Sequence, residues 1–179
     1  MTENASHETS RRFPSLADLL TKEVIELHGT ASDWREAVRL AGALLAKNEA
    51  VTPAYVEAMV KVVEELGPYM VVAPGIALAH ARPENGVQRP CMSLVRLASP
   101  VEFGSTANDP VDLIFAFGAV DKAAHLQALK ELAIFLQREE ATSALRRCDT
   151  VDEALGLIRE YGRDDPPPGK SGSTRSPAP

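Results

Sequence analysis

The segment VDLIFAFGAV, residues 111–120, restricts the fold of this chain more than any other. Nearly every residue in it is apolar. A strand with one face in water alternates apolar and polar residues, whereas a strand covered on both faces does not need to. The segment therefore predicts a β-strand inside a sheet that has helices on both faces.

The rest of the pattern supplies the other layers. Apolar residues spaced three and four apart, or helix-start signals, predict helices at residues 15–20, 32–50, 52–66, 125–136 and 150–162. β-type composition predicts further strands at residues 23–29, 69–73, 76–79 and 91–103. Strands interleaved with helices predict an α/β protein, a three-layer α/β/α sandwich around a central mixed sheet.

Polar residues mark where several of these helices begin. Ser32 or Asp33, Thr52 and Asp121 stand where an N-cap is needed, and a Thr150–Glu153 capping box is expected at the last helix. Helix 125–136 is expected to bury one apolar stripe, composed of Leu126, Leu129, Leu132, Ala133 and Leu136.

The 179 residues suffice for one core, and we expect one domain over residues 13–162. Residues 1–12 are polar without periodicity, and residues 163–179 are rich in Pro, Gly and Ser. Such segments bury too little apolar surface to offset the entropy of ordering them. Both are predicted to be disordered tails.

Composition excludes several classes of function. A net charge of −6 without a basic run argues against nucleic-acid binding. No signal peptide and no apolar run of about 18 residues is present, so we expect a cytoplasmic protein without membrane insertion. Cys91 and Cys148 are isolated, which predicts neither a metal site nor a disulfide. Gly-rich nucleotide motifs are absent, and no cofactor is expected.

Two of the four histidines are candidates for chemistry. His80 follows strand 76–79 at the start of a loop, where α/β sheets expose functional side chains. His125 falls in the first turn of the helix after strand 111–120, near free amides that favour an anion. Each also has a plain structural interpretation: His80 as a turn residue bonded to a carbonyl, and His125 as a neighbour of the apolar stripe.

Weaker candidates stand beside these two. Arg82 is close enough in sequence to reach an anion at His80, although an arginine in a polar loop is usually only solvated. Asn108 belongs to the turn-rich segment before strand 111–120 and is a candidate phosphate or loop contact. His28 precedes Gly29 and is expected to end a strand.

Three blocks of the chain carry a resemblance to a known family. They are VTPAYVEAMV, GPYMVVAPGIALAHARPENGV and SLVRLASPVEFGSTANDPVDLIFAFGAVDKAAHLQALKELAIFL. In order and content they resemble the enzyme IIA component of the sugar phosphotransferase system, within its fructose/mannitol superfamily and most of all the ascorbate-type branch. The resemblance covers residues 15–161.

The resemblance implies a phosphoryl relay. His80 matches the family's phosphorylated histidine, which accepts phosphate from the phosphocarrier protein HPr and is expected as tele-phosphohistidine. It would pass the group to a IIB component that feeds a sugar permease, for an ascorbate-like sugar. His125 matches the second active-site histidine, expected to stabilise the phosphate. The family usually has proline before the phosphorylated histidine, whereas this chain has Ala79.

Other interpretations stay open on the sequence alone. A regulatory relative would keep the fold and the histidine but signal through its phosphorylation state to a binding partner. A metal-dependent hydrolase using His80 and His125 would need a carboxylate-rich ligand set, which the sequence does not place near either residue. The oligomeric state is also open, a homodimer included.

Overall fold

A computed structural model describes residues 14–162 of the chain, so both predicted tails lie outside the described residues. Its sheet has five strands in the order β1-β4-β5-β3-β2. The pairs β1/β4 and β3/β5 are parallel, whereas β4/β5 and β2/β3 are antiparallel, so the sheet is mixed as expected. The strands are β1 (Ile25–Gly29), β2 (Val71–Ala73), β3 (Ile76–Ala79), β4 (Cys91–Val101) and β5 (Val111–Gly118).

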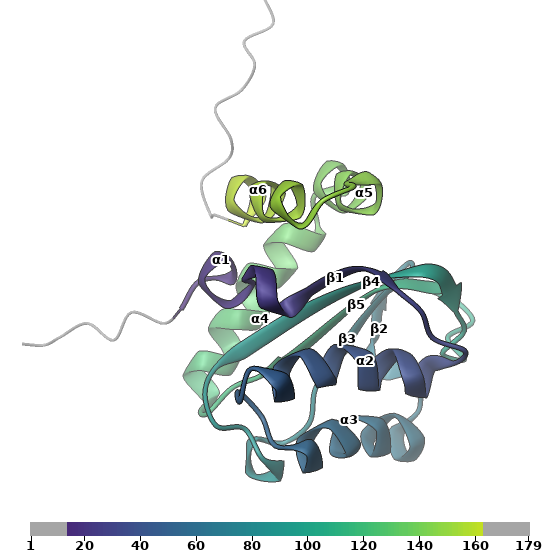
Figure 1. Ribbon diagram of the computed structural model, residues 1–179. Helices are drawn as coiled ribbons and strands as arrows, with labels where there is room; N and C mark the ends of the chain where they lie inside the picture. Colours follow the sequence, from purple (N-terminus) through teal and green to yellow (C-terminus); the bar gives the residue numbers. More distant parts are fainter. Residues whose placement is uncertain (1–13, 163–179) are drawn as a thin grey trace, which may run out of the picture.

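Helices cover both faces of this sheet. Figure 1 shows α2 and α3 on one side, and α1, α4, α5 and α6 on the other. Their bounds are α1 (Leu16–Leu19), α2 (Trp34–Lys47), α3 (Pro53–Leu66), α4 (Lys122–Leu136), α5 (Glu139–Arg147) and α6 (Val151–Tyr161). The three-layer α/β/α arrangement predicted from the sequence is confirmed.

β5 is the central element of both cores. Ile114 and Ala116 pack with the α2 and α3 side, whereas Leu113, Phe115 and Phe117 pack with the α4 to α6 side. Alternate side chains of a strand point to opposite faces, so an all-apolar strand is stable only with both faces covered. The expectation drawn from residues 111–120 is therefore confirmed.

The structure corrects three local expectations. α5 was not predicted, because its pattern offers few apolar positions, of which Ala141 and Leu145 are buried. At α6 the Thr150 hydroxyl accepts from the Glu153 amide as expected. The Glu153 carboxylate, however, accepts from the amide of Asp149 at 2.8 Å, so the reciprocal half of a capping box is replaced by a bond one residue earlier.

The third correction concerns the face of α4. Its buried residues are Ala124, Ala128, Leu132 and Phe135. Leu126, expected to be buried, is 67% exposed, and Ala133 is exposed as well. α4 carries apolar residues around most of its circumference, so periodicity alone did not decide which stripe faces the sheet.

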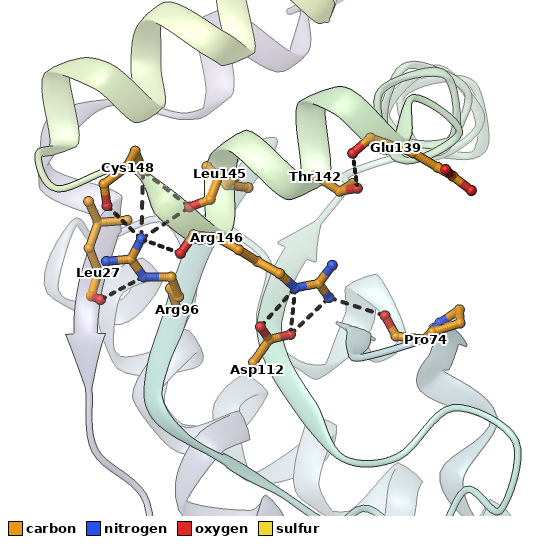
Figure 2. A network of polar contacts seen from close by, with 9 residues as sticks. All are labelled: Leu27, Pro74, Arg96, Asp112, Glu139, Thr142, Leu145, Arg146 and Cys148. Carbon is orange, nitrogen blue, oxygen red and sulfur yellow. Dashed lines mark hydrogen bonds and ion pairs between the residues drawn. The ribbon is translucent and has the colours of Figure 1, made fainter.

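Two arginines fasten α5 to one edge of the sheet (Figure 2). Arg96 of β4 donates to the Leu27 carbonyl and to three carbonyls at the end of α5, the closest being that of Cys148 at 2.6 Å. Arg146 forms a bidentate ion pair with Asp112 at the start of β5. This edge lies at the starts of β3 and β5, opposite to the ends from which both candidate histidines emerge.

Candidate functional site

Strand pairing brings His80 and His125 together. β3 and β5 are parallel, with Ala79 opposite Ala116, so the residues after both strands emerge at the same edge of the sheet. His80 is the first residue after β3, and His125 lies in the first turn of α4, which follows β5. The two imidazole ring centres are 6.1 Å apart, with the planes inclined at 67°.

Aromatic residues surround the pair. The Phe117 ring lies 5.1 Å from each imidazole, between centroids, and so supports both from the sheet side. Tyr69 meets His80 edge-on at 6.0 Å. Both histidines are only partly buried, so the pair faces outward over an apolar floor.

One hydrogen bond fixes the chemistry of the His80 ring. Its Nδ1 lies 3.0 Å from the carbonyl oxygen of Leu78. A carbonyl oxygen only accepts hydrogen bonds, so Nδ1 must carry the proton. In the neutral ring Nε2 then holds a free lone pair. The bond to a carbonyl considered from sequence is therefore present, and it leaves the opposite nitrogen available as a nucleophile.

The surroundings also keep His80 neutral. Burial lowers the pKa of His80 below its usual value, and the nearby His125 lowers it further. The bond to the Leu78 carbonyl acts in the opposite direction but is outweighed. A neutral imidazole is the nucleophilic form, so His80 is in its reactive state at neutral pH.

His125 is placed by the start of α4. The carboxylate of Asp121 accepts from the Ala124 amide at 2.8 Å, and the Asp121 carbonyl accepts from the His125 amide at 3.0 Å. This is the N-cap predicted from the sequence. Lys122 and Ala123 are the first two residues of α4, and their amides have no acceptor within the helix, so negative charge is favoured beside His125.

The two weaker candidates, Arg82 and Asn108, differ in where they lie relative to the paired histidines. Arg82 is exposed two residues beyond His80, at the start of a short 3₁₀ turn. Asn108 lies at the other ends of β3 and β5, where its side-chain amide donates to the Val71 carbonyl and its own carbonyl accepts from Gly75. Asn108 is thereby separated from His80 by the length of β3.

Two further observations concern residues around His80. Ala79 is fully buried within β3 and paired with Ala116, so the strand extends to the residue directly before the histidine. The hydroxyl of Tyr55, on α3, lies 3.1 Å from the Ala81 amide just after it. Sequence reasoning did not identify Tyr55, because a tyrosine on the apolar stripe of a helix shows no partner until the fold is known.

Within residues 14–162, no three His, Cys, Asp or Glu side chains gather so as to hold a metal ion. In the same range no helix is both long and apolar enough to cross a membrane.

The fold and the paired histidines define a class, a three-layer α/β domain that presents two imidazoles at one edge of a mixed sheet. Residues 18–161 match the family model "Phosphoenolpyruvate-dependent sugar phosphotransferase system, EIIA 2". The chain belongs to this family.

Individual relatives agree with the family match. The ascorbate-specific phosphotransferase EIIA component of Escherichia coli K12 is 40% identical over 141 residues, covering 78% of this chain and 92% of that protein. A phosphotransferase IIA structure from Streptococcus mutans superposes with a TM-score of 0.72 at 37% identity, over 77% of this chain and 88% of that one.

A solved complex is also similar. It contains the mannitol enzyme IIA of Escherichia coli with phosphorylated enzyme IIB. One chain of this complex superposes on the present chain with a TM-score of 0.69 at 29% identity, over 79% of this chain and 99% of that chain.

Proposed function

We propose that this protein is a cytoplasmic phosphoryl carrier of a phosphoenolpyruvate-dependent sugar phosphotransferase system. It accepts phosphate from phospho-HPr on Nε2 of His80 and passes it to a IIB component. The observation that carries the proposal is the bond from Nδ1 of His80 to the Leu78 carbonyl, which leaves Nε2 as the free nucleophile beside a second imidazole.

The transfer step follows from this geometry. The lone pair of Nε2 attacks phosphorus and forms an N–P bond, while the P–N bond to the HPr histidine breaks and its electron pair returns to that ring. The His80 ring gains positive charge, which the Leu78 carbonyl stabilises through the Nδ1 proton. Onward transfer to a cysteine or histidine of IIB runs the same exchange with His80 as the leaving group.

His125 would stabilise the negative oxygens of the transferred group. Phosphoryl transfer needs positioning and charge stabilisation more than covalent help from the protein. An imidazole donor at the start of α4, next to first-turn amides that have no acceptor within the helix, would supply such stabilisation.

Exposed apolar side chains around the pair support docking of protein partners. Leu126 follows His125 directly and is 67% exposed, Val120 before the α4 N-cap is 47% exposed, and Tyr69 against His80 is 48% exposed. A carrier must bring its histidine within bonding distance of another protein's reactive atom. The partner therefore has to cover the surface around that histidine in each complex. Apolar side chains gain stability from that burial.

The relatives support a sugar class and a partner. Relatives that are 40% identical to this chain, from Escherichia coli and Salmonella, are ascorbate-specific EIIA components, so we assign this protein to the uptake of an ascorbate-like sugar. The mannitol IIA protein solved with phosphorylated IIB supports a IIB partner for this chain. The proposal therefore names as the partner a IIB component that feeds a sugar permease. It does not name a regulatory protein that responds to the phosphorylation state.

The direct test is labelling with phosphoenolpyruvate, enzyme I and HPr, followed by addition of an ascorbate-type IIB. We expect one phosphoryl group per chain in a bond that is acid-labile and base-stable, and its loss to IIB. No labelling would contradict the carrier function. Labelling without transfer to IIB would support the regulatory alternative instead.

The protonation of His80 gives a pH prediction. Because burial lowers its pKa in the folded protein, the imidazole should titrate below the usual 6.5, as measured from its ring carbon and nitrogen NMR shifts. The unfolded chain then binds more protons than the folded one just below pH 6.5, so this group lowers the free energy of unfolding as pH falls through that window. A midpoint at or above 6.5 would contradict the buried, neutral ring.

A further inference from the structure

The Tyr55 hydroxyl is held inside the protein directly behind the site. Tyr55 lies on α3 and is 1% exposed. Its oxygen lies 2.9 Å from the Phe117 carbonyl oxygen, 3.2 Å from the Ala81 carbonyl oxygen, and 3.1 Å from the Ala81 amide nitrogen. One side-chain atom thus contacts the end of β5 and the residue that follows His80.

The single hydroxyl proton limits how these contacts are used. The oxygen accepts from the Ala81 amide and donates to one carbonyl at a time, the nearer being that of Phe117. Burial raises the pKa of Tyr55 to about 12, so the hydroxyl keeps its proton. It therefore joins two backbone segments and remains neutral.

These two segments carry the site. β3 ends at Ala79, so the amide of Ala81 lies beyond the strand pairing and finds its acceptor in Tyr55. The same hydroxyl fixes the carbonyl of Phe117, whose ring centre lies 5.1 Å from that of each imidazole. His80 is consequently held at two points. Its ring is bonded to the Leu78 carbonyl, and the backbone just after it is held by the bond between the Ala81 amide and the Tyr55 hydroxyl.

We infer that Tyr55 is a positioning residue for phosphoryl transfer, which holds the Nε2 atom of His80 toward the partner by bracing the Ala81 amide against the end of β5. The inference rests on the proposed function. Tyr55 does not touch the phosphoryl group; it acts only through the His80 backbone and Phe117.

Tyr55→Phe tests this by removing one oxygen while keeping the ring that fills the core. Small misplacements of a reacting group cost substantial rate, so phosphoryl acceptance from phospho-HPr should slow about 10-fold in single-turnover assays at saturating donor. 4-Aminophenylalanine at position 55 restores a donor to the Phe117 carbonyl but only a weak acceptor for the Ala81 amide, so it should recover only part of the rate.

A second measurement needs no phosphoryl transfer. Hydrogen exchange of the Ala81 amide should accelerate in Tyr55→Phe, and the His80 ring nitrogens should shift from one tautomer toward a mixture. If these changes occur but the wild type is not phosphorylated, the proposed function is wrong, whereas the contact by which Tyr55 holds the Ala81 amide is supported. If the wild type is phosphorylated and Tyr55→Phe matches it in both transfer rate and Ala81 amide exchange, the positioning role of Tyr55 is wrong.

Two controls separate positioning from general stability. Tyr161→Phe removes the same oxygen from a half-buried tyrosine of α6, and Ile158→Val removes one methylene from a fully buried residue of the other core layer. Both should keep the wild-type rate and Ala81 exchange. An equal slowing in either control would overturn the assignment, because the loss would then follow stability rather than the Ala81 contact.

Discussion

Replacing His80 with alanine is expected to abolish phosphorylation of this protein by phospho-HPr. The substitution removes the side-chain atom that the geometry presents as the nucleophile, Nε2, whose lone pair is left free by the bond from Nδ1 to the Leu78 carbonyl. His125 cannot replace it from the start of α4, because its ring centre is 6.1 Å from that of His80 and a different atom would have to face the donor. Acid-labile, base-stable label should fall to background.

A matched variant shows whether the loss is specific. His28→Ala removes an imidazole from an exposed position on β1, away from the paired rings, and should label as the wild type does. Thermal melting of both variants checks that each is folded. Full labelling of folded His80→Ala would move the nucleophile to another residue and refute the central assignment.

The architecture could be predicted from the sequence because the apolar composition of residues 111–120 directly indicates a strand that is buried on both faces. An all-apolar strand permits few alternatives, and the helices around it had caps such as Asp33 and Asp121 that the structure retains. The positions of His80 after a strand and His125 after a cap could be predicted for the same reason. Their 6.1 Å proximity requires the parallel pairing of β3 with β5, which local pattern does not encode.

Other features escaped prediction because they depend on contacts between distant segments. The face of α4 that packs on the sheet is chosen by the shape of the core, and this choice exposes Leu126 beside His125. Asn108 was a candidate phosphate or loop contact, and its turn lies at the starts of β3 and β5, where it bonds to Val71 and Gly75. Tyr55 is 26 residues from Ala81, so its hydroxyl finds a role only in the folded chain.

Replacing His125 is expected to slow transfer without abolishing it. His125→Ala removes a donor that would contact the phosphoryl oxygens, but leaves in place Nε2 of His80 and the bond from Nδ1 of the same ring to the Leu78 carbonyl. Loss of one preorganised donor costs on the order of 10–1000-fold in rate, and acceptance from phospho-HPr should fall within that range. Onward transfer to IIB should fall too, because both half-reactions pass through the same charge distribution.

His125→Gln makes this prediction specific to hydrogen bonding. A glutamine amide provides a donor of roughly similar reach and no titrating charge, so it should recover part of the rate lost in His125→Ala. The measurement is the rate of phosphoryl transfer in both half-reactions for the wild type and the two variants, at one pH and with folding checked by thermal melting. If both variants match the wild type in both directions, His125 contributes packing beside Phe117 and not charge stabilisation. If alanine and glutamine are equally slow, the imidazole acts through its shape or its position at the start of α4 rather than through a donated hydrogen bond.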